Sequence, residues 1–375
     1  MKKHQWIAGL VVLAALVGLM LWARERVHFN FGLFRAQVAQ VDWPLIVLAT
    51  GCIYAAFVFR AVRWAVLIRH QMRVPPLSLL GTQVMGFTAI ALIGRVADPV
   101  RPYLVARKTG LRLSTQLAVY VVERLCDAGS MALLFSVAMI WVPAGQIMQV
   151  TTAHSGMVAR LAVHHGGIAL LLARYGGLML TIVGTLFLVA IRWSGETVAG
   201  FCEAGFGAIS KNAGRAVGHK IRAFHSGLDT MRTFSDFALT ASLSIAMWLL
   251  IAGTYFMVCR AFVASPGLTA ISPFKCVLLM VASGSASVFQ LPVLGWFSQI
   301  GLVAVVLAAG FGVSPEAATA CAAMLLLVSF LSVVPVGLAW AQFDHVNLRK
   351  ITVESEQAEE ELEGEGQAAD ASAGP

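Results

Sequence analysis

Charged residues are scarce in this sequence of 375 residues: Asp, Glu, Lys and Arg make up 12% of it, and hydrophobic residues 58%. A soluble globular domain carries about 25% charged residues, so the composition excludes an ordinary soluble protein. The sequence has no G-x-x-x-x-G-K-[ST] loop, which excludes an ATP-driven pump within this chain. It has no HExxH motif and no close His or Cys cluster, so we expect no metal, no cofactor and no nucleic-acid partner. The six cysteines form no C-x-x-C pair, and we interpret them as small hydrophobic side chains.

Long apolar runs are what the sequence does contain. Each has about the length that an α-helix needs to cross a bilayer. Lipid offers no partner for a free backbone N–H or C=O group, so these runs must be helical. We therefore predict an all-α fold, a polytopic integral membrane helical bundle with about six full spans and two re-entrant or broken helical hairpins. The runs cover residues 6–22, 44–63, 77–93, 117–141, 168–191, 237–259, 276–291, 296–312 and 317–341.

Basic residues indicate the orientation of these spans. Lys2 and Lys3 place the N-terminus inside the cell, and five Lys and Arg residues place the segment 193–236 there too. The segment 142–167 holds only Arg160 among Lys and Arg residues and is expected outside. The first run has no small-residue cleavage site after it, so we expect a retained helix and not a signal peptide. Both termini are then cytoplasmic.

The stretch "IALIGRVADPVRPYLVARKTG" (90–110) conflicts with simple crossing. If the run before it crossed fully, Arg95, Arg101 and the basic residues that follow would all lie outside. The conflict disappears if the chain enters the membrane, breaks between Gly94 and Pro102, and returns to the same side. Broken backbone at membrane depth is tolerated only where protein or a wet cavity surrounds it. We therefore expect Arg95, Asp98 and Arg101 to line an interior site.

A second break lies in "ASGSASVFQLPVLGWFSQIG" (282–301), and similar residues follow both breaks. Gly110-Leu-Arg-Leu-Ser114 corresponds to Gly310-Phe-Gly-Val-Ser314, and a long apolar run comes next in each case. An odd number of expected spans separates the breaks, so the second unit would be inverted relative to the first. Inverted repeats with broken helices place the site of many transporters near the midplane of the membrane. Chance similarity between small residues is the alternative.

Charges also occur inside one apolar run, "LAVYVVERLCDAGSMALLFSVAMIW" (117–141). Steps of three and four residues place one polar set on a single helix face, and Arg124 lies beside it. We expect this stripe to face the bundle interior, opposite Arg95 and Arg101. Two interpretations stay open: the acids neutralise these arginines structurally, or the stripe also contacts a lipid headgroup. The polar set consists of Gln116, Tyr120, Glu123, Asp127 and Ser130.

The C-terminal end has a different composition. Residues 353–375 hold eight acidic residues and no basic one, which is typical of a disordered segment. We divide the chain into a membrane-embedded, flippase-like domain at 1–352 and a disordered acidic cytoplasmic tail at 353–375. The tail should be dispensable for insertion when the chain ends after Thr352. Without it, basic residues far outnumber acidic ones, which suggests contact with anionic lipid headgroups.

Three motifs resemble the transmembrane, flippase-like family of bacterial lysylphosphatidylglycerol synthases. The family has R-x-x-R-W at a helix end, P-x-R-x-G-E-x-x-R-x-Y-L in the next segment, and E-R-x-x-D in the helix after it. The second half, "LPVLGWFSQIG", is similar to the family element P-x-x-G-x-x-E, with Gln299 or Ser298 at the place of its Glu. The resemblance covers about residues 5–345. The matching residues are Arg60, Arg63 and Trp64, then Arg95, Asp98, Arg101, Tyr103 and Leu104, then Glu123, Arg124 and Asp127.

The resemblance implies lipid handling in the bacterial inner membrane, by a chain without the family's soluble aminoacyl-transferase domain. Our leading hypothesis is a translocase that moves a polar or anionic lipid, a membrane phospholipid or an isoprenoid-type lipid, between leaflets. A lipid-modifying transferase with Glu123 or Asp127 as base is one alternative. An accessory subunit of a lipid- or glycan-synthesis complex, with a membrane or soluble partner enzyme, is another. The expected headgroup-binding residues are Arg95, Asp98, Arg101, Tyr120, Glu123, Arg124, Asp127 and Gln299, and Arg60, Arg63 and Trp64 are expected to anchor at the membrane interface.

Overall fold

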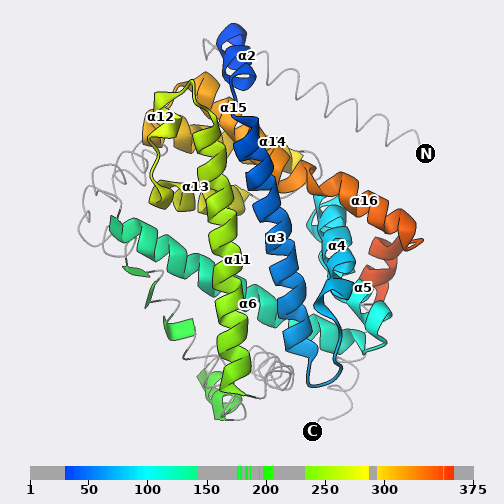
Figure 1. Cartoon of the computed structure of the whole chain (residues 1–375). Coiled ribbons are helices and arrows are strands. Elements are labelled where there is room, and N and C mark those ends of the chain that lie inside the picture. Colours follow the sequence, from blue (N-terminus) through cyan, green and yellow to red (C-terminus); the bar gives the residue numbers. More distant parts are fainter. Residues whose placement is uncertain are drawn as a thin grey trace.

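A computed structural model describes residues 30–141, 233–286, 294–348 and 350–358, together with short helical pieces between 175 and 205. Every named element within these ranges is a helix (Figure 1). Two of them, η4 and η5, are short π-helical turns within longer helices. The elements are α2 (Phe31–Ala39), α3 (Trp43–Ile68), η1 (Pro76–Leu79), α4 (Leu80–Ile93), η2 (Arg95–Ala97), α5 (Val100–Thr109), α6 (Leu113–Trp141), α11 (Phe234–Ala261), α12 (Pro266–Thr269), α13 (Pro273–Ala286), α14 (Leu294–Val305), η4 (Val306–Gly310), α15 (Pro315–Leu326), η5 (Leu327–Leu331) and α16 (Val333–Phe343).

Five helices are long and apolar enough to cross a membrane, counted within the described ranges. The predicted class, a polytopic helical membrane protein, is therefore confirmed. The expected span at 6–22 and most of that at 168–191 lie outside the described residues. The five helices are Trp43–Ile68, Pro76–Ile93, Leu113–Trp141, Ser235–Ala261 and Pro315–Phe343.

Helices α3 and α11 form an antiparallel pair at the centre of the bundle (Figure 1). Polar contacts join the two helices at both ends of the pair. At one end the backbone N–H of Asp42 donates to the carbonyl oxygen of Ala261 at 2.8 Å. At the other end Arg69 forms an ion pair with Asp236, which also caps the first turn of α11. Since each helix opens one half of the chain, the two halves run in opposite directions.

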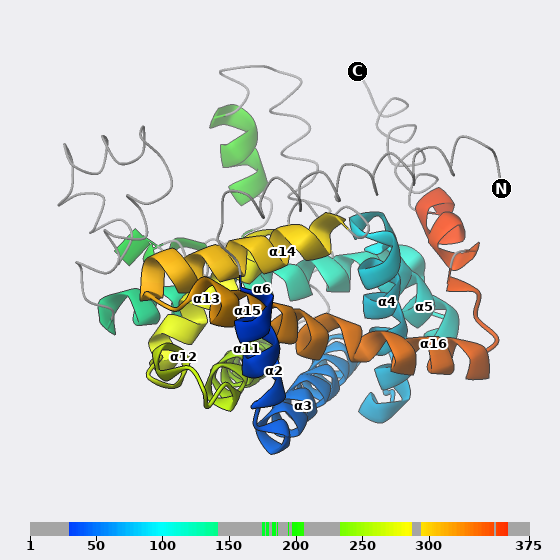
Figure 2. The same ribbon diagram turned by 90° about the horizontal axis from the view of Figure 1, so that it is seen from above.

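Each half continues with a helical hairpin and then a long helix. Figure 2 shows α4 and α5 on one side of the bundle and α13 on the other. In the first hairpin Gly94 breaks the helix at φ 95°, and α5 returns beside α4. A glycine in the left-handed conformation then precedes the long helix in both halves: Gly110 at φ 72° and Gly312 at φ 70°. The described helices therefore have the arrangement of an inverted repeat. The sequence comparison that paired Gly110 with Gly310 was two residues out of register.

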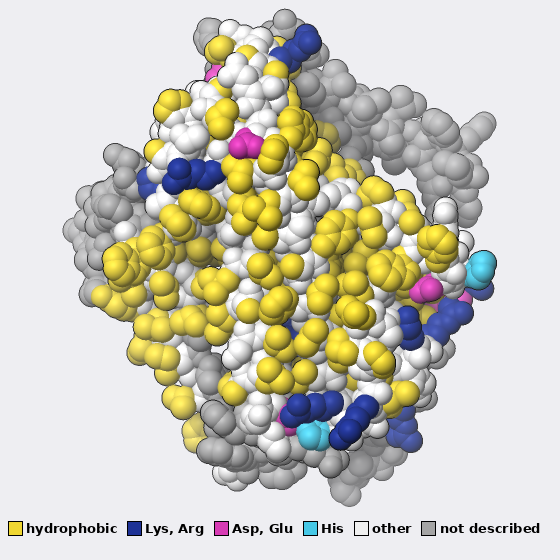
Figure 3. All heavy atoms as spheres, viewed as in Figure 1, with side chains coloured by type: hydrophobic (Ala, Val, Ile, Leu, Met, Phe, Trp, Pro, Cys, Tyr) yellow, Lys and Arg dark blue, Asp and Glu magenta, His cyan; other side chains and the backbone are white. Residues whose placement is uncertain are grey.

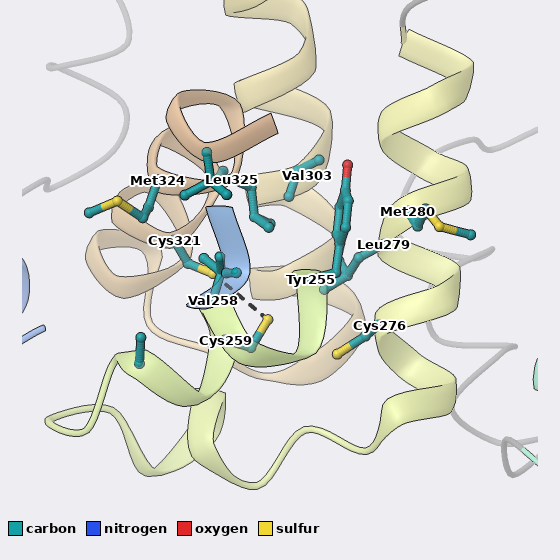
Figure 4. Packing of buried hydrophobic residues seen from close by; sticks show 14 of the residues in the cluster. Tyr255, Val258, Cys259, Cys276, Leu279, Met280, Val303, Cys321, Met324 and Leu325 are labelled. Atoms are coloured by element: carbon teal, nitrogen blue, oxygen red, sulfur yellow. Dashed lines mark hydrogen bonds between the residues drawn. The ribbon is translucent and has the colours of Figure 1, made fainter. Parts of the chain in front are cut away.

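The packing and the surface both fit a membrane environment. Figure 4 shows the side chains of Tyr255, Cys259, Cys276 and Cys321 packed among aliphatic residues of α11, α13 and α15. All six cysteines are free thiols, as expected for small hydrophobic side chains. Hydrophobic side chains cover the middle of the face in Figure 3, and Lys, Arg and His gather at its margins, at the lower end among them. This distribution is that of a protein crossing a hydrocarbon layer between two polar ones.

The chain stays helical beyond the predicted start of the acidic tail. Residues 350–358 are helical, and Ile351, Thr352 and Ser355 are buried. Leu348 and Ile351 pack in the same cluster as Leu104 of α5. The prediction that disorder begins at residue 353 is therefore wrong for 353–358, because the acidic composition hides one buried helix face. The remainder, 359–375, lies outside the described residues, so a disordered tail there stays a prediction.

Two truncated chains test whether residues 353–358 stabilise the fold and residues 359–375 do not. A chain ended after Ala358 should unfold in detergent at the temperature of the full chain, because it loses only residues of solvated, acidic composition. A chain ended after Thr352 should lose about 1–2 kcal/mol of stability, because it lacks buried Ser355 and the hydrogen bond from the Tyr103 hydroxyl to Glu354. Thermal unfolding followed by tryptophan fluorescence measures both. Equal unfolding temperatures for the two truncated chains would contradict the docking of this helix.

Candidate functional site

A cavity of about 410 Å³ lies between the two halves of the bundle. Charged residues of α3, η2, α5 and α6 line one part of it, and apolar and aromatic residues line another. Both halves of the chain contribute to its wall. The lining residues are Ile53, Ala56, Phe57, Arg60, Phe87, Ile90, Arg95, Asp98, Arg101, Arg124, Asp127, Ala128, Met131, Trp248, Ile251, Tyr255, Met280, Ser283, Gly284, Ser329 and Phe330.

A chain of four buried charges supports the polar part of this cavity. Arg63 lies between two carboxylates of α6, at 2.5 Å from Glu123 and 2.6 Å from Asp127. Glu123 in turn accepts from Arg101 of α5 at 2.9 Å. The chain Asp127–Arg63–Glu123–Arg101 therefore alternates in sign. Its members are at most 4% exposed, so water does little to weaken these interactions.

Neutral groups extend this network to two further helices. Arg101 donates to the Gln83 side chain of α4 at 2.7 Å, and Arg63 donates to the Ser244 hydroxyl of α11 at 2.6 Å. The indole N–H of Trp248, also on α11, donates to Asp127 at 3.2 Å. One cluster of polar side chains thus connects α3, α4, α5, α6 and α11. Charge pairs are strong at such a site only when further hydrogen bonds satisfy their remaining groups. These bonds satisfy part of them, while Arg63 Nε and Asp127 Oδ2 have no partner among the described residues.

A glycine makes room for one member of this cluster. A Cβ atom added at Gly86 of α4 would overlap the side chain of Arg101. Without it, α4 and α5 approach closely enough for Arg101 to reach both Gln83 and Glu123. The guanidinium also lies 5.4 Å from the ring centre of Trp64, within the range of a cation–π contact. Arg101 is therefore fixed on several sides and points toward the cavity wall that it lines.

The charged groups of the cavity wall that lie outside this network are more accessible. Arg95 and Arg124 are exposed and Asp98 is half-buried. Four arginines line the cavity, whereas two aspartates do, so the lining has a positive surplus. The Oδ2 atom of Asp127 is buried and has no hydrogen-bond partner among the described residues. The polar wall therefore holds both a surplus of guanidinium groups and one carboxylate oxygen that is still able to accept a hydrogen bond.

Aromatic rings form the apolar part of the wall. The ring of Phe87 lies 5.3 Å from that of Phe57 and 5.1 Å from that of Phe330. Phe330 belongs to the π-helical turn η5 (Leu327–Leu331), which interrupts the long helix formed by α15 and α16. π-Helical turns occur frequently at functional sites. Here the turn brings Ser329 and Phe330 to the cavity, opposite α3 and α4.

The second hairpin contributes neutral groups. The Gln299 side-chain amide of α14 donates to the Ser283 hydroxyl of α13 at 2.6 Å. Ser283 lines the cavity, whereas Gln299 is buried behind it and is not part of the wall. Gln299 was expected to contact a headgroup, so the structure corrects that expectation. Its position indicates a support for Ser283.

Several other sequence expectations meet the structure at this point. Gln116, Glu123, Asp127 and Ser130 are buried on the inner face of α6, as their spacing indicated. Tyr120 is half-buried, and its ring lies 5.0 Å from the Arg124 guanidinium and 5.6 Å from that of Arg101. Arg101 is a counter-charge of Glu123, as expected. Exposed Arg95 lines the cavity together with Asp98.

The expected interface anchors need correction. Arg63 and Trp64 are each 1% exposed, so neither lies at a membrane surface. Arg63 is paired with both acids of α6, and the indole N–H of Trp64 donates to Gln116 at 2.8 Å. Arg60 lines the cavity. The reason is geometric: α3 crosses the acidic stripe of α6, which no local pattern in α3 indicates.

Three residues of the buried network were missed from the sequence. Gln83, Ser244 and Trp248 each sit alone in an apolar run, where a single polar or aromatic residue has many neutral explanations. Two of them were detectable in principle. An amide or hydroxyl inside a predicted membrane helix needs a hydrogen-bond partner, and a buried charge on another helix is the strongest one that this chain offers.

Glu123 is the residue on which the network's stability should depend most. In Glu123→Gln two buried arginines lose their shared carboxylate, and losing one partner of a buried ion pair costs about 3–5 kcal/mol. We therefore expect a markedly lower unfolding temperature in detergent and less protein in the membrane. Asp344→Asn, which neutralises an exposed carboxylate, is the matched control and should unfold like the unmodified chain. If both variants unfold at the same temperature, the network does not hold the bundle together.

Comparison with known proteins agrees with this architecture. The family model of the lysylphosphatidylglycerol synthase TM region matches residues 6–337. No curated protein and no solved structure matches the chain. The matched range includes every residue of the buried network and of the cavity wall. The family's name relates it to membrane phospholipids. The chain is thus a multi-pass membrane protein linked to lipid handling, and it belongs to the lysylphosphatidylglycerol synthase TM region family.

Proposed function

We propose that the chain is a translocase that moves an anionic lipid between the leaflets of the bacterial inner membrane. The observation that carries this proposal is the amphipathic cavity, with an arginine-rich wall on one side and a phenylalanine-rich wall on the other. A lipid has the same division into a charged headgroup and apolar chains. The lipid would be a phospholipid or an isoprenoid-type lipid, both of which carry phosphate.

The polar wall favours an anionic headgroup for two reasons. Guanidinium groups bind phosphate oxygens through paired, charge-assisted hydrogen bonds. A positive surplus inside a membrane protein is also unfavourable until an anion neutralises it. Arg124 and Arg95 are accessible for this contact, whereas Arg101 is held by Gln83 and Glu123 at the back of the wall. The headgroup would thus be bound by accessible arginines in front of a fixed one.

The arrangement of the two halves supports movement across the membrane. Inverted halves with broken helical hairpins allow a central site to face each side in turn. The charged groups come from the first half, whereas Ser283, Ser329 and Phe330 come from the second. The cavity wall therefore includes the interface that would rearrange. The contact between Phe57, Phe87 and Phe330 crosses that interface. It would close the cavity toward one side of the membrane while the headgroup is bound.

A transferase is the second candidate, and one atom favours it. The Oδ2 of Asp127 is buried at the cavity wall and lacks a hydrogen-bond partner among the described residues, so it is placed to accept a proton from a lipid hydroxyl. Glu123 is a poor base by comparison, because two arginines hold its carboxylate. Translocation leaves the lipid chemically unchanged, whereas transfer consumes a donor.

Liposomes distinguish these functions. The purified chain, reconstituted without any cosubstrate, should move a fluorescent phosphatidylglycerol between leaflets, measured by the fraction that an impermeant quencher reaches. Arg124→Gln should slow this movement at least about tenfold, because it removes one charge-assisted contact to the phosphate. Its unfolding temperature should change little, because Arg124 is exposed.

The matched control is Arg35→Gln, which removes an exposed arginine from α2, far from the cavity. It should move the lipid at the rate of the unmodified chain. Equal rates for Arg124→Gln and Arg35→Gln would refute the headgroup site. A new lipid mass that appears only when a donor is present, and that disappears in Asp127→Asn, would favour the transferase.

Orientation is part of the same proposal. We infer that both termini are cytoplasmic, as the basic residues indicate. Lys108, at the exposed end of α5, would then face the cytoplasm, and Arg35 of α2 would lie outside. In a cysteine-free chain within intact cells, a cysteine at position 35 should react with an impermeant thiol reagent, and a cysteine at position 108 should not. The opposite labelling pattern would invert the orientation.

A further inference from the structure

A second cavity, of about 650 Å³, lies at the end of α3 that is tied to Asp236. It shares no lining residue with the cavity between the two halves. Its wall is apolar along α3 and at the start of η1, and its edge is basic. The apolar residues are Val62, Ala65, Val66, Val74, Pro75 and Pro76, and the basic edge consists of Arg69, His70 and Arg73.

The order of these residues along the chain makes the cavity amphipathic. Val62, Val66 and Arg69 recur at steps of four and three residues, so they share one face of the helix and its cap. Going down this face, side chains change from aliphatic to cationic. Figure 3 shows Lys or Arg and His side chains gathered at the lower end of the molecule, directly below its broad hydrophobic surface. A membrane's hydrocarbon layer meets its headgroups at such a boundary.

One acidic residue partly neutralises the basic edge. Asp236 forms an ion pair with Arg69 and lies 2.8 Å from the Nε2 atom of His70. The carboxylate itself is 1% exposed, but the Arg69 side chain is 40% exposed and Arg73 is also exposed. The edge therefore presents two arginine side chains to solvent, while the acid that orients one of them is hidden beneath. Arginine in such a position recognises phosphate.

We propose that this cavity is a binding site for one anionic phospholipid of the adjoining leaflet. The phosphate contacts Arg69 and Arg73, and an acyl chain lies along Val62 and Val66. The site is separate from the proposed translocation site and does not depend on it. Since Arg69 also holds Asp236 at the start of α11, a lipid bound here reinforces the contact between α3 and α11.

Native mass spectrometry of the full chain in detergent tests the proposal, with phosphatidylglycerol as the probe and phosphatidylcholine of the same chains for comparison. All measurements use a chain that carries Arg124→Gln, which weakens lipid binding at the first site. The lipid that stays bound to this chain is then bound mainly at the second site. In this background, Arg73→Gln should weaken phosphatidylglycerol binding about fivefold, the effect of one basic residue near an anionic surface. Val66→Trp, which fills the apolar wall, should weaken it further. Phosphatidylcholine should bind weakly throughout.

Two comparisons would overturn the proposal. Arg35→Gln removes the same charge at the opposite end of the molecule, and binding equal to that of Arg73→Gln would mean that no specific site exists. Soluble glycerol 3-phosphate carries the phosphate without acyl chains. One contrary outcome is that it raises the unfolding temperature as much as the lipid does, with both increases unaffected by Val66→Trp. In that case the cavity binds a free anion and not a lipid. The Arg73→Gln variant should translocate lipid at the rate of the unmodified chain. That rate would show that its weaker lipid binding does not come from damage to the first site.

Discussion

The fold depends on one constraint, that charges inside a membrane protein must be paired. The alternating chain Asp127–Arg63–Glu123–Arg101 meets it with four side chains from α3, α5 and α6, and their hydrogen bonds reach α4 and α11. Each charge alone would cost several kcal/mol at such depth. Because every member shares a partner with another, none of α3, α5 and α6 can leave without depriving a buried charge of its partner. The positions of the first hairpin and of α11 against α6 follow from this requirement.

The two halves of the inverted arrangement contribute different kinds of side chain to the cavity. The first hairpin carries Arg95, Asp98 and Arg101, whereas the second has Gln299 bonded to Ser283. The two halves share their backbone arrangement, as the left-handed glycines Gly110 and Gly312 show. They do not share the charged residues at the cavity. The second hairpin meets the cavity through neutral groups in its described part, so it could tilt there without breaking an ion pair of the buried network, whereas the first hairpin is held by the pair between Arg101 and Glu123. If the chain works as the proposed translocase, movement between the halves would cost least free energy at the apolar phenylalanine contacts.

Patterns local to one helix were predictable from the sequence, and contacts between distant helices were not. Spacing alone placed Glu123 and Asp127 on the inner face of α6, and the conflict with basic residues led to the hairpin at Gly94. Arg63 lies 60 residues before Glu123, and nothing near it indicates which helix it meets. Gly86 is needed only because Arg101 passes there. The helix at 350–358 was missed because glutamates surround its few buried residues.

The pairing of the buried charges also explains why a cavity and not a dry core lies beside them. The network satisfies Glu123 fully, yet leaves Asp127 with an unpartnered oxygen and leaves Arg124 and Arg95 accessible. A core that existed only for stability would gain by replacing such groups with apolar ones of similar volume. Polar groups that the network leaves accessible or unpartnered beside a 410 Å³ space fit the proposed binding of a lipid in that space. The surplus of guanidinium groups there fits the anionic headgroup of the proposed lipid, and the phenylalanines opposite fit its apolar chains.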